Sequence, residues 1–239
     1  LSIENNLKYR QELYDLNDNL IHRFDDMVLH HEIENVLLWD IDNPNLYNLK
    51  TILYDENNVY DIRVDRIGFR TVQFRKDGFY LNGKRVIIRG LNRHQAYPYV
   101  GYAMPESMQK QDADILKYEL GCNAVRTSHY PQSHHFINAC DELGLLVFTE
   151  IPGWQYIGNL DWQEVAINNT KDMILQYRNH PSIMIWGVRI NESQDDDAFY
   201  IDEEPTANGD QYLFIDYDDF GHDRLRIYEK PVMRFNMEE

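Results

Sequence analysis

Short runs of alternating apolar and polar residues, separated by turn residues, fill the chain up to residue 74. Residues 50–64 alternate in this way, and Tyr54–Asn58 within them predicts a hairpin turn. Asn43–Asn45, with a proline at its centre, predicts a loop. Because such alternation is typical of strands with one buried face, the region predicts about five or six strands of an antiparallel β-sandwich.

From residue 75 onward, continuous apolar runs alternate with segments of helical spacing. The predicted strands are 85–91, 123–126, 145–149 and 183–188, and the predicted helices are 105–120, 133–143 and 161–177. Gly144 supplies a left-handed stop for the second helix, and Asp161 with Glu164 predicts the cap of the third. The apolar face of the third helix comprises Trp162, Val165, Ala166, Met173, Ile174 and Tyr177.

Strands that alternate with helices form a parallel sheet. No glycine-rich phosphate loop follows the first of these strands, so the pattern favours a (β/α) barrel over a dinucleotide-binding sheet. A complete barrel takes about 250 residues. The chain is therefore predicted to be multidomain β plus α/β, with a partial sandwich over 1–74 and an incomplete TIM (β/α)8-type barrel over 75–239.

Polar side chains follow each of the four predicted parallel strands. Their positions are Asn92, Arg93 and His94, then Arg126, Ser128 and His129, then Glu150, and finally Asn191 and Glu192. The carboxyl ends of parallel barrel strands meet at one rim, where the catalytic groups of such barrels lie. Two acids at the ends of apolar strands must be paired or solvated by a cleft, so the pattern predicts an active site.

Structural roles are the alternative for several of these residues. Arg93 and Arg126 are equally suited to ion pairs within the fold, and Ser128 to a local hydrogen bond. Trp154, in the loop after the third strand, suits either stacking on a sugar or closing an edge of the core. A zinc site at His129, His134 and His135 is disfavoured, because adjacent helical residues point about 100° apart.

The formal net charge is −17, which repels phosphate backbones and anionic lipid surfaces, so neither nucleic acid nor a membrane is expected as a partner. The two cysteines, Cys122 and Cys140, are predicted to be buried free thiols. No apolar run reaches membrane-spanning length, and residues 1–20 lack a signal-peptide pattern. A cytoplasmic location is expected, with a secreted or periplasmic one as the alternative.

Several motifs together resemble glycoside hydrolase family 2, and within it the β-galactosidase type. They are Arg66–Arg70, Phe79–Lys84, Ile88–His94, Asn123–Pro131, Cys140–Leu145, Arg178–Ile183 and Trp186–Ser193, in this order along the chain. Leu38–Asp40 and Pro44–Tyr47 resemble the end of the immunoglobulin-like β-sandwich domain that precedes the barrel in this family.

The resemblance implies hydrolysis of terminal β-galactosides with retention of configuration, by two carboxyl groups. Glu192 matches the acid/base and Asn191 the residue that binds the sugar 2-hydroxyl. The other implied substrate-binding residues are His94, Arg126, His129, Glu150, Trp154 and Tyr217, the last at the end of a segment, 212–222, that resembles the sixth barrel strand of the family.

Two departures from the family pattern change these expectations. Residues 151–158 lack the Glu and His that bind magnesium in related galactosidases, so no cofactor is expected. Lys230–Asn236 resembles the nucleophile motif but ends in Asn, which cannot form a glycosyl ester, so the nucleophile is expected to be absent or displaced. The chain thus resembles a fragment or an internally shortened galactosidase.

Uncovered strand edges in an incomplete barrel predict a homo-oligomer or dependence on chain segments outside this sequence. A non-catalytic carbohydrate-binding or interaction module derived from the barrel is the alternative function. Within the family, β-glucuronidase and β-mannosidase are the competing specificities.

Overall fold

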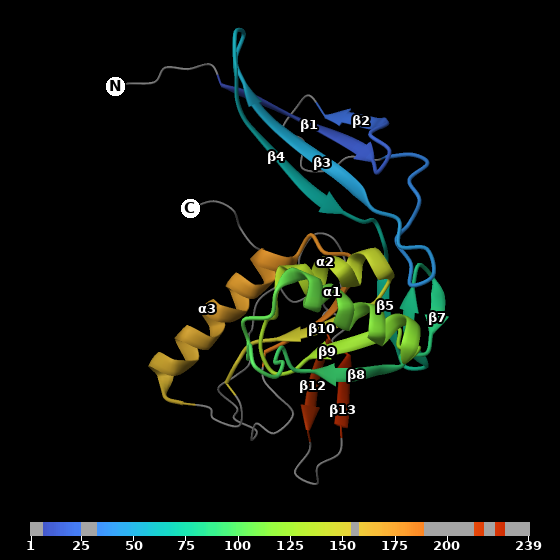
Figure 1. Ribbon diagram of the computed structural model, residues 1–239, viewed down its shortest axis with the longest axis vertical. Coiled ribbons are helices and arrows are strands. Elements are labelled where there is room, and N and C mark those ends of the chain that lie inside the picture. Colours follow the sequence, from blue (N-terminus) through green and yellow to red (C-terminus); the bar gives the residue numbers. More distant parts are fainter. Residues whose placement is uncertain (1–6, 25–32, 154–157, 189–212, 218–222, 228–239) are drawn as a thin grey trace.

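The computed structural model describes residues 7–24, 33–153, 158–188, 213–217 and 223–227, the last two ranges by their backbone alone. An antiparallel sheet comes first along the chain, and a parallel sheet with its helices follows (Figure 1). The first is a four-stranded antiparallel sheet in the order β2-β1-β3-β4. Its strands are β1 Lys8–Asp15, β2 Leu20–Phe24, β3 Tyr47–Tyr54 and β4 Val59–Ile67.

The predicted hairpin is confirmed between β3 and β4, which pair antiparallel. Asp55 closes its turn, because one carboxylate oxygen accepts hydrogen bonds from the amides of Asn57 and Asn58, both at 2.7 Å. Leu13, Phe24 and Tyr47 form the buried core against this sheet. The sheet holds four described strands rather than five or six, since the next strand along the chain belongs to another sheet.

The second layer is a parallel sheet in the order β11-β10-β9-β8. Its strands are β8 Gly90–Arg93, β9 Ala124–Thr127, β10 Leu146–Glu150 and β11 Ile183–Gly187. The helices on one side of it are α1 Glu106–Asp114, continued by the π-helix η1 Ile115–Glu119, then α2 His134–Leu143 and α3 Leu160–Tyr177 (Figure 1). The parallel arrangement of four neighbouring strands with intervening helices is an incomplete TIM barrel, as predicted.

Of the two predicted helix caps, Gly144 is confirmed and Asp161 is not. Ser133 caps α2 through its side chain, and Gly144 ends that helix with φ of 70°. The cap of α3 is Asn159, whose side chain accepts a hydrogen bond from the amide of Trp162 at 3.1 Å, so the prediction of Asp161 was wrong. Val165 was also misplaced on the apolar face, since it is 57% exposed.

The predicted strand 85–91 is divided in two. Its first part is in β7 Lys84–Val86, which forms a small antiparallel sheet with β5 Val72–Arg75 and β6 Gly78–Leu81. Its second part begins β8. The Asn123 side chain holds the break, accepting from the amide of Arg89 at 2.7 Å and donating to the carbonyl of Ile87 at 2.9 Å.

The small sheet packs beneath the parallel strands. Phe74, Phe79 and Leu81 share a buried core with Ala124 and Leu146. A second core, on the other side of the parallel sheet, contains Val125 and Val147 together with the apolar faces of the helices. Successive residues at the start of β9 and β10 therefore serve different cores, as the alternation of side chains along a strand requires.

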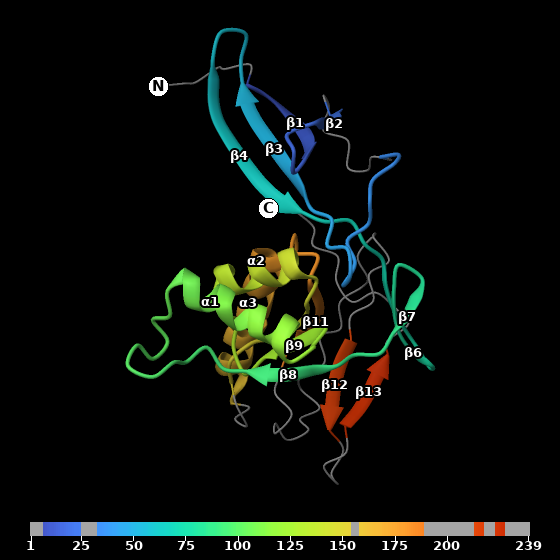
Figure 2. The ribbon, with the colours of Figure 1, turned by 45° about the vertical axis from the view of Figure 1, so that its right-hand side comes forward.

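Residues 213–217 form β12 Leu213–Tyr217, which pairs antiparallel with β13 Asp223–Ile227 in a separate two-stranded sheet. The expectation of a sixth parallel barrel strand here was therefore wrong. β12 contacts β11, and both strands lie away from the helices (Figure 2).

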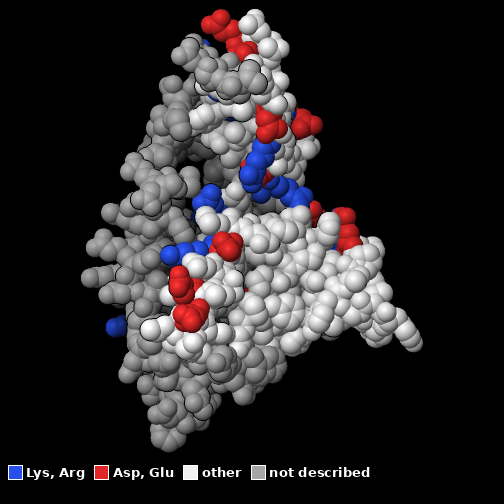
Figure 3. All heavy atoms as spheres, turned by 90° about the vertical axis from the view of Figure 1, so that its left-hand side faces the viewer, with Lys and Arg blue, Asp and Glu red and all other residues white. Residues whose placement is uncertain are grey.

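Hydrogen bonds and an ion pair connect residues 39–66 to the helical layer. The indole nitrogen of Trp39 donates to the carbonyl of Asp141 at 2.8 Å, and Lys117 Nζ donates to the carbonyl of Ile41 at 2.6 Å. Arg66 and Glu142 form an ion pair of 2.6 Å between the two regions. On the face drawn in Figure 3, basic side chains (Lys and Arg) lie next to acidic ones (Asp and Glu) among the described residues.

Both cysteines are buried and free, as predicted, although Cys122 precedes β9 instead of lying within it. Among the described helices, none is long and apolar enough to cross a membrane.

Candidate active site

A buried ion pair joins the ends of β9 and β10. Arg126 donates from Nε at 3.1 Å and from Nη2 at 2.8 Å to the same oxygen, Oε2 of Glu150. The Glu150 side chain is fully buried, whereas that of Arg126 is 18% exposed. The Arg126 guanidinium also lies 5.2 Å from the ring centre of Phe148. A carboxylate in such a place is stable because its charge is paired at hydrogen-bonding distance.

His129 completes this cluster. Its Nδ1 lies 2.7 Å from the other carboxylate oxygen, Oε1 of Glu150, and 3.3 Å from Arg126 Nη2. The carboxylate oxygen accepts this hydrogen bond, so Nδ1 of His129 is its donor. The hydrogen bond to Glu150 thus fixes the orientation of the imidazole.

His94 stands beside the cluster at the end of β8. Its ring centre is 5.5 Å from that of His129, at an interplanar angle of 72°, and 6.1 Å from that of Tyr130. His94 is exposed. Burial raises the pKa of Tyr130, whose hydroxyl oxygen accepts a hydrogen bond from the amide of Gln95 at 2.9 Å. Four predicted residues, His94, Arg126, His129 and Glu150, thus come together at one rim.

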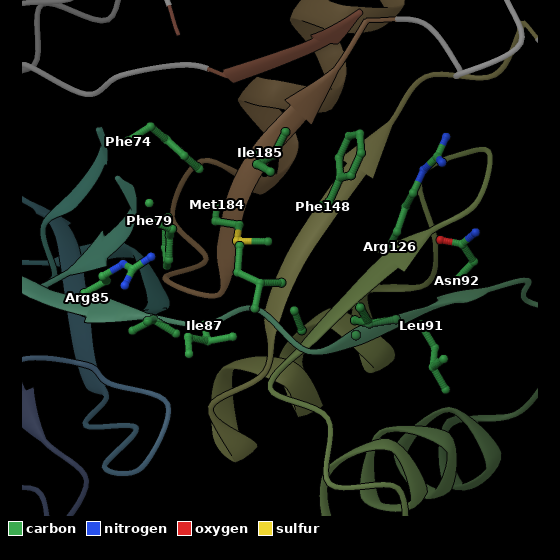
Figure 4. A pocket seen from close by; sticks show the side chains of 16 residues that line it. Phe74, Phe79, Arg85, Ile87, Leu91, Asn92, Arg126, Phe148, Met184 and Ile185 are labelled. Carbon is green, nitrogen blue, oxygen red and sulfur yellow. The ribbon is translucent and has the colours of Figure 1, made fainter. Parts of the chain in front are cut away.

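A cavity of about 560 Å³ lies beside the parallel sheet, on the side away from the helices. Arg126 and Asn92 lie at one end of it, and Phe74, Phe79 and Arg85 lie at the other (Figure 4). Met184, Ile185 and Phe148 line the part between them. The cavity is therefore apolar along most of its length and polar at the carboxyl ends of the strands, which is typical of a ligand site.

Two family models together cover most of the chain. The model described as "Glycosyl hydrolases family 2, TIM barrel domain" matches residues 72–219, and the one described as "Glycosyl hydrolases family 2" matches residues 3–70. The chain belongs to glycosyl hydrolase family 2. The first match contains the parallel sheet and the polar cluster, and the second contains the antiparallel sheet.

Individual members of family 2 agree with this assignment. The chain is 55% identical to a β-galactosidase of Thermoanaerobacterium thermosulfurigenes over 219 residues, which are 84% of this chain and 30% of that protein. It is 57% identical over 178 residues to a β-galactosidase of Thermoanaerobacter pseudethanolicus, covering 74% of this chain and 24% of that protein. The chain thus spans under a third of the length of these relatives.

Among solved structures of the family, a β-glucuronidase from Ruminococcus gnavus in complex with D-glucuronic acid superposes with a TM-score of 0.75. The two are 28% identical, and the match covers 80% of this chain and 33% of that one. This neighbour thus agrees with the family assignment made from the two family models.

Sequence analysis left open whether Arg93 and Arg126 have structural or functional roles, and the structure gives the two arginines different roles. Arg93 is buried within the helical layer of this family 2 chain, where it donates to Asp112 at 2.7 Å and to Gln109 at 2.8 Å. Its guanidinium also lies 3.9 Å from the ring centre of Phe136. Arg93 is therefore a structural residue, and Arg126 belongs to the site.

Ser128 does not make the expected local hydrogen bond through its side chain. It is buried, and within the described part of the chain its hydroxyl has no hydrogen-bond partner. His129 and His134 do not share a ligand position. Nδ1 of His129 lies 2.7 Å from Oε1 of Glu150, whereas Nε2 of His134 lies 2.7 Å from Nε2 of Gln176. Over residues 7–24, 33–153 and 158–188, no group of three or more His, Cys, Asp or Glu side chains is placed to hold a metal ion.

Gly187 is a site residue that sequence analysis missed. A Cβ atom at this position would lie 2.6 Å from Cβ of Glu150 and 2.7 Å from the Phe148 ring. Only glycine lets β11 approach the end of β10 so closely. A glycine at the end of an otherwise apolar strand was the available signal.

The remaining predicted site residues cannot be placed beside the cluster. Glu192, Asn191 and Trp154 lie outside the described residues, and Tyr217 is described by its backbone alone, as the last residue of β12. Glu192 follows the end of β11 by five positions, where β11 is the neighbour of β10 in the sheet.

Proposed function

We propose that this chain forms the acid/base side of a β-galactosidase active site, which hydrolyses terminal non-reducing β-D-galactose residues of β-galactosides with retention. The Arg126, His129 and Glu150 cluster at the carboxyl ends of two neighbouring strands is the observation that carries the proposal. The two relatives named β-galactosidase support the choice of sugar.

Two carboxyl groups perform the reaction. Glu192 protonates the glycosidic oxygen while a second carboxylate attacks the anomeric carbon, so that the aglycone leaves as an alcohol and a glycosyl ester forms. Glu192 then takes a proton from water, which attacks the same carbon and releases galactose and the carboxylate. Asn191, the residue before the acid/base, would bind the sugar 2-hydroxyl.

The described cluster binds the sugar in this proposal. Glu150 orients the His129 ring, which would contact a hydroxyl of the sugar. His94 would approach from the exposed side, and Glu150 fixes the position of the Arg126 guanidinium at the rim. Trp154 and Tyr217 would add contacts to the same sugar.

The second carboxylate of the mechanism is the nucleophile. The position that matches it is Asn236, and an amide cannot replace a carboxylate as nucleophile. We therefore propose that turnover uses a displaced acid, for which Glu238 and Glu239 are the nearest in sequence, or an acid from outside this chain.

Hydrolysis of 4-nitrophenyl β-D-galactoside by the chain, compared with its Glu192→Gln variant, tests the proposal. Loss of turnover in this variant is expected, whereas Glu164→Gln, an exposed change in α3, should leave the rate unaltered. Turnover that survives Glu192→Gln would refute the role of Glu192. Saturable galactoside binding with no turnover by the unaltered chain would instead support the carbohydrate-binding module.

A β-glucuronidase is the second candidate, since the solved family 2 structure described above is a β-glucuronidase. Such an enzyme needs a cation for the substrate carboxylate. In the described cluster the cation is Arg126, and Glu150 already occupies both its Nε and its Nη2. We therefore expect 4-nitrophenyl β-D-glucuronide, and the corresponding mannoside, to be hydrolysed more slowly than the galactoside.

Assembly and location are proposed on the same basis. We expect the chain to sediment as a homo-oligomer, or to become a stable monomer only when further segments of the barrel are added. A monodisperse monomer of the chain by itself would contradict this. A cytoplasmic location is proposed, and cell fractionation tests it against a periplasmic or secreted one.

A further inference from the structure

β4 Val59–Ile67 forms an exposed, apolar edge of the antiparallel sheet. Among the described strands it pairs with β3 alone, and β2 forms the opposite edge (Figure 1). The first six residues of β4 are exposed and its last three are partly buried. Tyr60 is 50% exposed, and Ile62 and Val64 are each 53% exposed. A long edge strand with exposed apolar side chains is a template on which another strand can pair.

The backbone of β4 has hydrogen-bonding groups that face away from β3. The amide of Ile62 donates to Oδ1 of the preceding residue, Asp61, at 2.9 Å. This bond directs the Ile62 amide toward the open side of the strand. Since the directions of N–H and C=O groups alternate along a strand, those of Val64 point to the same side. The edge therefore offers donors and acceptors to a further strand.

The charged residues of this edge alternate in sign. Asp61, Arg63 and Asp65 occupy every second position, so they lie on the face opposite to that of Ile62 and Val64. Arg63 forms an ion pair of 2.8 Å with Asp65, yet its side chain remains 73% exposed and can contact a second carboxylate. Charges on an edge strand commonly oppose pairing. In β4 their order is instead complementary to the same sequence read in the opposite direction.

We propose that β4 is the surface through which two copies of this chain form a dimer, by pairing their β4 strands antiparallel about Ile62. Ile62 then lies opposite Ile62 of the other copy, and Tyr60 of each copy lies beside Val64 of the other. On the other face, Asp61 of each copy lies opposite Arg63 of the other, which gives two ion pairs. The Ile62 amide transfers its hydrogen bond to the carbonyl of the other Ile62, and this releases Asp61 for Arg63. Such a contact is closed by a two-fold axis.

Charge and burial select this register over its neighbours. Centring the pair on Arg63 would place that guanidinium opposite its own copy and Asp61 opposite Asp65, so that like charges face each other. Centring it on Val64 would bring the partly buried end of β4 into the contact. The exposed stretch, residues 59–64, instead has Ile62 near its middle. A second copy paired about Ile62 is therefore the strand that fits this edge.

This inference deepens the proposed function at one point, because it rests on the homo-oligomer proposed above and assigns a surface to it. That surface belongs to the antiparallel sheet and not to the strands of the incomplete barrel. The inference therefore predicts a dimer contact that remains in place when further segments of the barrel are added.

Cysteine cross-linking tests the register. Ile62→Cys places two thiols opposite each other, and opposed residues of such a pair have Cα atoms about 5.5 Å apart, a distance that a disulfide spans. Val64→Cys is the matched control, because it is equally exposed and its two thiols would lie about 14 Å apart along the strands. The native Cys122 and Cys140 are buried, so mild oxidation acts on the new thiol. On a non-reducing gel, Ile62→Cys should form a covalent dimer and Val64→Cys should not.

Exchange of the two charges tests which residues face each other. Asp61→Arg and Arg63→Asp each place like charges opposite one another in both ion pairs, so each should raise the dissociation constant about 10-fold in sedimentation equilibrium. The combined variant, Asp61→Arg with Arg63→Asp, restores opposite charges and should return the constant to within about 3-fold of that of the unaltered chain. Lys76→Glu, a charge reversal in the exposed turn between β5 and β6, is the control and should leave the constant unchanged. All of these side chains are exposed, so the variants are expected to fold, and circular dichroism checks this.

Each outcome bears on the inference in a defined way. If the chain sediments as an oligomer whose dissociation constant neither single reversal changes, the inference is overturned while the homo-oligomer stands. If the combined variant does not recover, or if Val64→Cys cross-links as well as Ile62→Cys, the strands do not pair about Ile62 and the inference is wrong. If the unaltered chain is a monomer at every concentration, the inference and the homo-oligomer are both overturned. Galactoside turnover is assayed separately, so the catalytic part of the proposed function stands or fails independently.

Discussion

Replacement of Glu150 by glutamine should destabilise the chain strongly. The carboxylate accepts three hydrogen bonds, two from Arg126 and one from His129, and its side chain is fully buried. Glutamine has nearly the shape of glutamate, but it lacks the negative charge. Its NH2 group would also face the donor groups of Arg126 and His129. Removing one partner of a buried pair costs about 3–5 kcal/mol, because the other charge remains uncompensated.

Urea unfolding followed by tryptophan fluorescence measures this loss, since the midpoint and slope give the free energy of unfolding. Glu142→Gln is the matched control. Glu142 forms an ion pair of 2.6 Å with Arg66, but both side chains are substantially exposed, so about 1 kcal/mol or less should be lost. If Glu150→Gln costs no more than Glu142→Gln, burial does not strengthen the cluster and the reasoning fails.

Three further predictions concern packing, pH and metal. Gly187→Ala should lower the free energy of unfolding by about 1–3 kcal/mol in the same assay, because the added methyl group meets Glu150 and Phe148; an unchanged midpoint would contradict this close approach. Burial raises the pKa of Tyr177 from 10.0 to about 12, so its stabilising contribution is complete below pH 10 and declines as pH rises toward 12. The stability difference between the chain and Tyr177→Phe should therefore shrink over that interval, and a constant difference would refute the shift. Treatment with EDTA should leave any galactosidase rate unchanged, whereas a loss restored by magnesium would show that the expectation of no cofactor is wrong.

Most of the parallel sheet was predictable because three of its strands, β9, β10 and β11, begin with apolar residues. Val125, Val147 and Ile183 face the helices while their neighbours face the small sheet, so both faces are covered and the runs show no polar gaps. The position of the site followed from the same pattern, since Arg126 and Glu150 come where these runs end.

Long-range contacts account for what the sequence pattern did not predict. Gly90 is the local signal for a break in 85–91, but the side chain that holds the break, Asn123, is more than thirty positions away. Asn159 and Asp161 are both good capping residues, and the choice between them depends on the path of the chain that enters α3. The contact between Gly187 and Glu150 likewise requires knowing which strands are neighbours.

The placement of Trp39 has a consequence for how this protein can be divided. Its indole is fully buried in the same core as Ala124 and Leu146 of the parallel sheet, and its nitrogen donates to Asp141 at the end of α2. An expression fragment that starts at residue 75 would lack this side chain and leave the Asp141 carbonyl and the apolar residues around it facing water. The core of the barrel part thus contains a side chain of the preceding part, so the two are best produced as a single polypeptide.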